Sequence, residues 1–173
     1  AAGGAWHSPN AGVSWMPMTD DQASLAVGAI ALDNCDAQAG CADVYVGTGE
    51  NNIRRDTYYG AGLLIGSMSG SSPLIYSWTL SGQDIFNRAS INNVVLDRSP
   101  PGDPRIYVTL SSGVTASATE STVTAPEPAS GYGIYRSEDH GGSWTKLAVA
   151  ESNGARPTDL EIDWVSSLDG LIS

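Results

Sequence analysis

The octapeptide Ser137-Glu138-Asp139-His140-Gly141-Gly142-Ser143-Trp144 decides the fold that we expect for this chain of 173 residues. A second copy, Ser8-Pro9-Asn10-Ala11-Gly12-Val13-Ser14-Trp15, carries Asn10 in the position of Asp139. The carboxylate of Asp139 can accept several backbone N–H groups of a turn, and Gly141 can adopt a positive φ at little cost. The pattern therefore predicts a tight hairpin held by the acid, beneath which Trp144 packs. Asn10 can hold a turn in the same way, but more weakly, because its bonds lack the assistance of a charge.

Tryptophans mark a longer repeat. Trp15, Trp78 and Trp144 each follow a serine and are separated by 63 and 66 residues, although the octapeptide pattern is lost before Trp78. Between them, short segments rich in β-branched and aromatic residues recur in one order, and no long window shows a helical period of apolar residues. The recurring segments are 27–33 with 91–97, 43–48 with 105–110, and 60–65 with 131–136. Four strands per repeat predict an all-β fold, a β-propeller of four-stranded antiparallel blades. A two-sheet sandwich is the main alternative, but it does not require the order to recur.

The repeat predicts an incomplete propeller over residues 1–173, with two full blades and two partial ones. Within the second full blade, residues 111–130 are rich in Ser, Thr, Ala and Pro and predict an extended insertion loop. Because propellers have about 4–8 blades, we expect missing sequence or another chain to supply the rest. The expected parts are the last two strands of a blade in 1–18, full blades in 24–80 and 88–148, and the start of a further blade in 158–173.

The two octapeptides resemble the Asp boxes of BNR-repeat propellers, the superfamily of sialidases, sortilin-like receptors and xyloglucan-cleaving glycoside hydrolases. The run from Trp15 to Gly62 is similar to secreted bacterial BNR-repeat proteins, many of which have no assigned activity. The resemblance implies that Asp139 is structural rather than catalytic, and that ligand sites lie on the face opposite to the boxes. The box residues are Ser8, Asn10, Gly12 and Trp15 in the first copy and Ser137, Asp139, Gly141 and Trp144 in the second.

The loop over residues 49–60 is the richest in functional groups on that opposite face. Arginine forks, carboxylates, amides and aromatic rings are the groups that recognise sugars and carboxylates. A solvated loop with weak Arg–Asp surface pairs is the alternative. The candidate ligand-binding residues are Glu50, Asn51, Arg54, Arg55, Asp56, Tyr58 and Tyr59. By contrast, we expect His7 and His140 to be exposed residues of the two hairpins.

Catalysis and metal binding have weaker support. Asp21 and Glu50 are candidates for the acid and base of a glycoside hydrolase, although nothing in their spacing requires that chemistry. Oxygen atoms of Glu50, Asn51 and Asp56 could hold calcium. No calcium-binding loop motif supports such a site, so we predict no metal and no other cofactor.

Charge and cysteine content limit the partners and the compartment. The chain has 8 Lys and Arg against 19 Asp and Glu, a formal net charge of −11, which disfavours nucleic acid as a partner. No stretch of about 20 apolar residues predicts a membrane span. Cys35 and Cys41, the two cysteines of the chain, predict a small loop closed by a disulfide, with two free thiols as the alternative. A disulfide indicates an oxidising compartment, so we expect a secreted or cell-envelope protein.

These observations favour a secreted or cell-surface propeller module that binds or scaffolds glycans or protein partners without catalysis. One alternative is a fragment of a glycoside hydrolase that acts on polysaccharide. A second is a structural subunit of a surface layer or filament, in which edge strands pair between chains.

Overall fold

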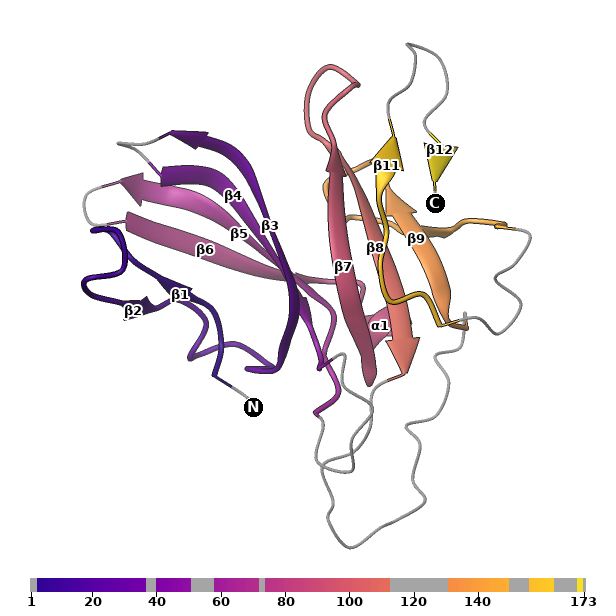
Figure 1. The fold of residues 1–173 in the computed structure, drawn as a ribbon, viewed down its shortest axis with the longest axis horizontal. Helices are drawn as coiled ribbons and strands as arrows, with labels where there is room; N and C mark the ends of the chain where they lie inside the picture. Colours follow the sequence, from indigo (N-terminus) through magenta and orange to yellow (C-terminus); the bar gives the residue numbers. More distant parts are fainter. Residues whose placement is uncertain are drawn as a thin grey trace, which may run out of the picture.

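The computed structural model describes residues 3–36, 40–50, 58–71, 74–112, 131–149, 156–163 and 171–172. In these residues the fold is all-β, with two four-stranded antiparallel sheets, two two-stranded sheets and one helix of four residues (Figure 1). The prediction of an all-β chain with four-stranded antiparallel sheets is therefore confirmed. No helix in this part of the chain is long and apolar enough to cross a membrane.

The first four-stranded sheet contains β3 (Val27–Asp36), β4 (Gly40–Thr48), β5 (Leu63–Ser71) and β6 (Leu74–Ser81), paired in chain order. Alternation along β4 sends Val44 and Val46 to one face of the sheet and Tyr45 to the other, as strand geometry requires. All three side chains are buried, and Tyr45 belongs to a different core cluster from the two valines. Each face of this sheet therefore contains buried side chains.

The second four-stranded sheet contains β7 (Ala89–Asp97), β8 (Arg105–Ser112), β9 (Gly133–Ser137) and β10 (Thr145–Lys146), again in chain order. Helix α1 (Gln83–Phe86) lies in the connection from β6 to β7. The register of β7 on β8 shifts between Ile91 and Asn93, and that of β3 on β4 shifts between Val27 and Ala29. The two sheets therefore share a β-bulge near the start of the first strand.

Two short hairpin pairs lie at the ends of this arrangement. They are β1 (Trp6–His7) with β2 (Met16–Pro17), and β11 (Ile162–Asp163) with β12 (Leu171–Ile172). The register of β1 on β2 repeats that of β9 on β10, because Trp6 lies opposite Pro17 as Tyr135 lies opposite Lys146. Both pairs fall within the segments expected to form partial blades.

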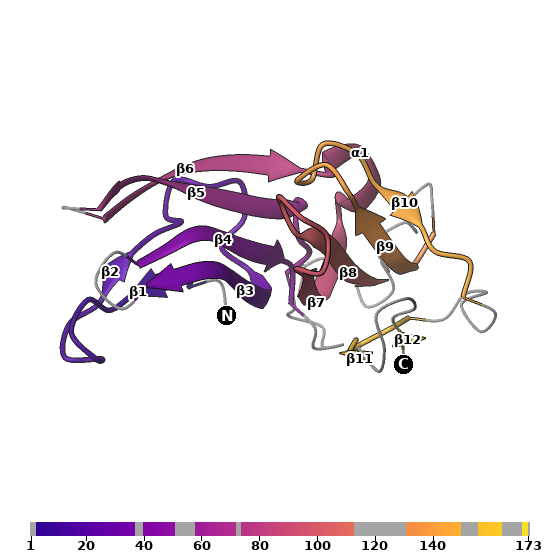
Figure 2. The ribbon, with the colours of Figure 1, turned by 90° about the horizontal axis from the view of Figure 1, so that it is seen from above.

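The sheets are stacked face to face. The β1–β2 hairpin covers the outer face of the first sheet, and β11 lies against the far face of the second, as Figure 2 shows from above. The largest buried cluster lies between the two four-stranded sheets. It combines Tyr45 and Ile65 of the first sheet with Ile91 and Val108 of the second.

Gly47 allows the two sheets to approach closely. A Cβ atom at Gly47 would lie 2.5 Å from Ile91 Cγ2 and 3.2 Å from the Ile91 carbonyl oxygen. Interiors are packed too tightly to leave such a contact unrelieved, so β4 needs a residue without a side chain here. Gly28 of β3 meets the same carbonyl group of Ile91.

The loop between β3 and β4 is closed by a disulfide between Cys35 and Cys41, so this prediction is confirmed. The two cysteines lie opposite each other in the register of β3 and β4. The hydroxyl of Tyr76, on β6, donates a hydrogen bond of 2.7 Å to the carbonyl of Cys41. The disulfide loop is therefore also anchored to the last strand of its own sheet.

Candidate functional site

The β9–β10 hairpin is held by hydrogen bonds around Asp139. Its carboxylate accepts the hydroxyl of Ser143 at 2.6 Å, the backbone N–H of Ser143 at 2.8 Å and the hydroxyl of Ser137 at 2.8 Å. Ser137 Oγ also accepts the N–H of Gly141 at 2.8 Å, and Gly141 has a φ of 84°. The hydroxyl of Ser143, then its N–H, then Ser137 favour the charged form and lower the pKa of Asp139 to about 2. This carboxylate is therefore engaged within the turn.

The β1–β2 hairpin repeats the same geometry with an amide. Asn10 Oδ1 accepts the backbone N–H of Ser14 at 2.8 Å, and Asn10 Nδ2 donates to Ser14 Oγ at 2.9 Å. The N–H of Gly12 donates to Ser8 Oγ at 2.6 Å, and Gly12 has a φ of 87°. The Ser14 hydroxyl accepts a bond where the Ser143 hydroxyl donates one, so the same turn forms without a charge.

The tryptophan at the end of the β9–β10 hairpin, Trp144, links the two four-stranded sheets. Trp144 Nε1 donates a hydrogen bond of 2.9 Å to Ser81 Oγ, at the end of β6, and Ser81 Oγ donates to the carbonyl of Gly141. The ring of Trp144 also contacts Phe86 edge to face, with 4.9 Å between the ring centroids. By contrast, Trp15 of the β1–β2 hairpin is 58% exposed, so the two hairpins differ in how their tryptophans are covered.

His7 and His140 are half-buried, so the expectation that both are exposed was wrong. The His140 ring lies 5.8 Å from the Tyr45 ring, and its nitrogens lie 3.9 Å and 3.8 Å from carboxylate oxygens of Asp43 and Asp103. The hairpin folds over the buried Tyr45, which shields His140 from solvent. Burial raises the pKa of Tyr45 well above its usual range, and the hydroxyl has no hydrogen-bond partner in the part of the chain that the structure describes.

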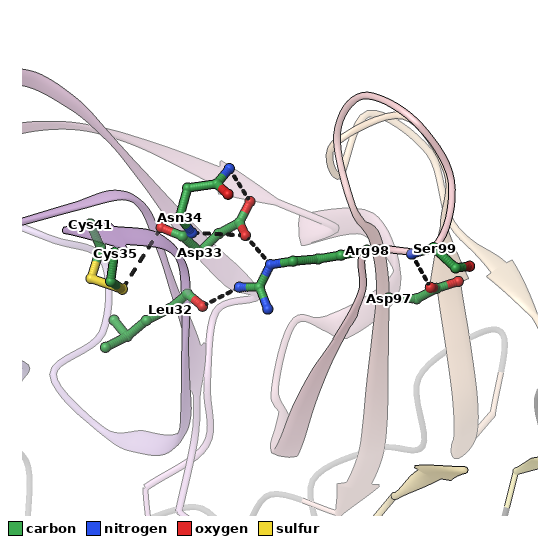
Figure 3. Close-up of polar contacts among 8 residues, drawn as sticks. All are labelled: Leu32, Asp33, Asn34, Cys35, Cys41, Asp97, Arg98 and Ser99. Atoms are coloured by element: carbon green, nitrogen blue, oxygen red, sulfur yellow. Dashed lines mark hydrogen bonds and ion pairs between the residues drawn. A yellow bond between two sulfur atoms is a disulfide. The ribbon is translucent and has the colours of Figure 1, made fainter. Parts of the chain in front are cut away.

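An ion pair joins the two four-stranded sheets near the C-terminal ends of β3 and β7 (Figure 3). Arg98, just after β7, donates from Nε to the carboxylate of Asp33 on β3 and from a terminal nitrogen to the Leu32 carbonyl at 2.7 Å. Asp33 is almost fully buried, as is its counterpart Asp97, which pairs with Arg105 at 3.3 Å. The repeated Leu-Asp sequence at the ends of segments 27–33 and 91–97 was the available signal for these buried carboxylates.

The candidate ligand-binding loop lies beyond the other end of β4. Glu50 and Tyr58 close its base, because the N–H of Glu50 donates to the Tyr58 carbonyl at 2.9 Å and the N–H of Tyr58 donates to Glu50 Oε2 at 3.2 Å. Tyr58 and Tyr59 are 47% and 39% exposed. The Arg88 guanidinium lies 5.3 Å from the centroid of the Tyr59 ring, a cation–π arrangement. Arg88 was not predicted as a site residue. Its φ of 65° lies in the left-handed region, which the residue type arginine does not indicate.

The other predicted site residues are not all brought together. Asp21, in the connection from β2 to β3, accepts a hydrogen bond of 2.7 Å from Gln22 Nε2 rather than pairing with Glu50. Asn51, Arg54, Arg55 and Asp56 lie outside the described residues, as does most of the 111–130 insertion. Within the described ranges, no three His, Cys, Asp or Glu side chains gather as a metal site requires. Calcium at Glu50, Asn51 and Asp56 was an alternative to the prediction of no metal, and two of these three residues lie outside the described ranges.

An open groove of about 550 Å³ lies between the β1–β2 hairpin and the outer face of the first sheet. Trp6 and Trp15 line it from the hairpin, and Ile30 and Leu32 line it from β3. These four side chains are between 48% and 58% exposed. The groove was not predicted, because it depends on which faces of the strands remain uncovered after the sheets have stacked.

Comparisons with other proteins find no relative. No protein-family model, curated protein or solved structure matches this chain. A function for the chain is therefore inferred from its own residues and contacts.

Proposed function

We propose that this chain is part of a β-propeller of the Asp-box type, and that it acts outside the cell as a binding or scaffolding module without catalysis. The repetition of one unit carries the proposal. The two four-stranded sheets share strand order, register and β-bulge, and two hairpins share the same set of turn hydrogen bonds. Repeated four-stranded sheets around a central axis are the units of a propeller.

Burial on both faces of each sheet favours this arrangement over a two-sheet sandwich. A sandwich buries the inner faces of its sheets and presents polar outer faces to solvent. Here Val46 is buried on the outer face of the first sheet, and Ile134 is buried on the far face of the second, where Leu160 packs against it. Stacks of more than two layers are what successive blades require. The disulfide supports an oxidising compartment.

The exposed aromatic and arginine side chains beyond β4 support ligand binding. Tyr58 and Tyr59 are 47% and 39% exposed, so part of each ring is accessible to a sugar, and the Arg88 guanidinium, which lies over the Tyr59 ring, offers a planar donor beside them. Such a combination of aromatic surface and a few polar groups is typical of carbohydrate recognition. A glycan is therefore the ligand that we propose for this face.

A glycan array tests the binding proposal. We expect Tyr59→Ala and Arg88→Ala each to weaken binding by about tenfold, which corresponds to about 1.4 kcal/mol. Ile75→Ala is a matched control, because Ile75 is 51% exposed on β6 and its truncation should leave binding unchanged. If the folded protein retains no glycan, or if all three variants bind equally, the glycan proposal is wrong.

A hydrolysis screen on polysaccharides tests the absence of catalysis. We expect no turnover above that of buffer. Turnover that is abolished by Asp21→Asn or Glu50→Gln, with glycan binding retained, would overturn the non-enzymatic proposal and favour a glycoside hydrolase.

A further inference from the structure

The arginines of this protein differ in their partners according to the end of the sheets at which they lie. In the part of the chain that the structure describes, Arg88 and Arg156 have no carboxylate partner, and each lies over a tyrosine ring instead. The described arginines at the opposite end, beside the β9–β10 hairpin, all pair with acids. These pairs are Arg98 with Asp33, Arg105 with Asp97 and Glu138, and Arg136 with Glu138.

The two arginine–tyrosine contacts have nearly the same geometry. The Arg88 guanidinium carbon lies 5.3 Å from the centroid of the Tyr59 ring, and that of Arg156 lies 5.2 Å from the centroid of the Tyr132 ring. Tyr59 directly precedes the recurring segment 60–65, whereas Tyr132 lies inside the corresponding segment of the second repeat. The same contact is therefore formed from different sequence positions at two successive junctions between sheets.

Backbone contacts hold both arginines in place. The N–H of Arg88 donates to the Gly60 carbonyl at 3.0 Å, and the N–H of Gly60 donates to the Ala89 carbonyl at 2.8 Å. At the second junction, Asn92 Nδ2 on β7 donates a hydrogen bond of 3.2 Å to the carbonyl of Pro157, which directly follows the second arginine. Both arginine side chains are exposed, so their guanidinium groups are accessible from solvent.

The two contacts lie at one end of the protein. Strands β7 and β9 both begin beside the last residues of β8, because Ala89 lies opposite Ser112 and Gly133 lies opposite Leu110 (Figure 1). The first arginine directly precedes β7, and the tyrosine beneath the second directly precedes β9. Both guanidinium groups therefore belong to the end of the protein for which we propose glycan binding.

We propose that Arg88 and Arg156 bind carboxylate groups of one acidic polysaccharide, a polymer of uronic acid. This proposal rests on the glycan-binding function proposed above and names the class of glycan. A guanidinium presents its N–H donors in a planar fork that matches a carboxylate, and a tyrosine ring supports the guanidinium without neutralising its charge. Two such groups at one end favour a ligand with several acids, which a uronic acid polymer carries on every ring.

The exposure of the two tyrosines gives them different roles. Tyr132 is 6% exposed, so its ring supports Arg156 from beneath and offers little surface to a ligand. Tyr59 is 39% exposed, so a sugar ring can contact it beside the carboxylate that Arg88 binds. The net charge of −11 gives the protein no general attraction for a polyanion, so binding of a uronic acid polymer reports these local contacts.

Calorimetric titration with a hexamer of galacturonic acid tests the proposal. The comparison ligand is the same hexamer with its carboxyl groups methyl-esterified, which keeps the sugar rings and linkages but removes every negative charge. We expect the acid to bind at least about tenfold more tightly than the ester. Dextran sulfate, a polyanion without carboxylates, should bind more weakly than the acid.

Protein variants assign the binding to the two arginines. Arg88→Gln and Arg156→Gln should each weaken binding of the acid hexamer by about tenfold. Arg136→Gln is the matched control, because it removes the same charge at the opposite end of the sheet, where Arg136 pairs with the exposed carboxylate of Glu138. All three variants are first shown to be folded by circular dichroism.

Three outcomes would overturn the assignment of a uronic acid polymer. They are equal affinity for acid and ester, dextran sulfate binding as tightly as the acid, and a loss in Arg136→Gln as large as that in Arg156→Gln. In each of these cases the proposed binding of glycans can still stand, because a neutral glycan on the array tests it separately. If no glycan of any charge binds the folded protein, both proposals fail.

Discussion

Ser81 connects the β9–β10 hairpin of the second sheet to the last strand of the first, so Ser81→Ala tests how the sheets are joined. Its hydroxyl donates to the carbonyl of Gly141 and accepts the indole N–H of Trp144 at 2.9 Å. Both partners belong to the β9–β10 hairpin, and Ser81 is 6% exposed. Alanine removes both hydrogen bonds while leaving the shape of the contact almost unchanged.

The expected loss follows from the burial of the two partners. Gly141 is buried, and an acceptor left unpaired in such a place costs about 1–3 kcal/mol, while the half-buried N–H of Trp144 loses a bond worth about 0.5–1.5 kcal/mol. We therefore expect Ser81→Ala to lower the free energy of unfolding by roughly 2–4 kcal/mol. With a urea dependence of about 2 kcal/mol per molar, the unfolding midpoint should fall by about 1–2 M.

Urea unfolding of a double-mutant cycle checks this prediction. Trp144→Phe removes the indole N–H, and the double variant should lose less stability than the sum of the single variants by about 1 kcal/mol. Ser69→Ala is the matched control, because Ser69 is exposed and makes a bond of 3.3 Å to the Ile75 carbonyl, so its effect should stay within about 0.5 kcal/mol. If Ser81→Ala and Ser69→Ala unfold at the same urea concentration, Ser81 does not bridge the sheets as described.

Three further changes test other contacts. Cys35→Ser should lower the free energy of unfolding by about 2–3 kcal/mol, because the disulfide closes a short loop in the unfolded chain, and the variant should unfold at the same urea concentration as the reduced protein. The pKa of Asp139 is about 2 in the folded protein against an ordinary 3.8, so its contribution to stability is complete above the higher value and is lost as the pH falls through the lower one. Asp139→Asn should flatten the fall in stability in that window, and an unchanged acid profile would contradict this. Gly47→Ala should lower the free energy of unfolding by about 1–3 kcal/mol, because the new Cβ forces Ile91 to shift. The loss should be smaller in a chain that already carries Ile91→Ala. Equal losses in the two chains would refute the close contact.

Local patterns in the sequence were sufficient to predict the strands and the disulfide. Alternation of side chains and turn residues are properties of neighbouring positions, so the segments 43–48 and 105–110 could be recognised as strands without knowledge of their partners. The disulfide followed from two cysteines six positions apart. The order of four strands followed from the recurrence of the same segments in both repeats.

Contacts between repeats could not be predicted, because they depend on how the sheets stack. Ser81 and Gly141 are 60 positions apart, and nothing in the residues around either one identifies the other. His140 was expected in solvent because its hairpin was considered alone, without Tyr45 beneath it. Arg88 was missed for the same reason, since its position over Tyr59 arises from the connection between the two sheets.

The order of the strands within each sheet bears on how the chain folds during synthesis. Every strand of the two four-stranded sheets pairs with the strand next to it in the sequence, so neither sheet needs a strand from a distant part of the sequence in order to form. The first sheet is complete once Ser81 has left the ribosome, before β7 has emerged, and chains grow from the N-terminus at about 5–20 residues per second. The first sheet can therefore form as a hairpin stack on its own, and its Gly47 face becomes the surface on which β7 is laid down as it emerges.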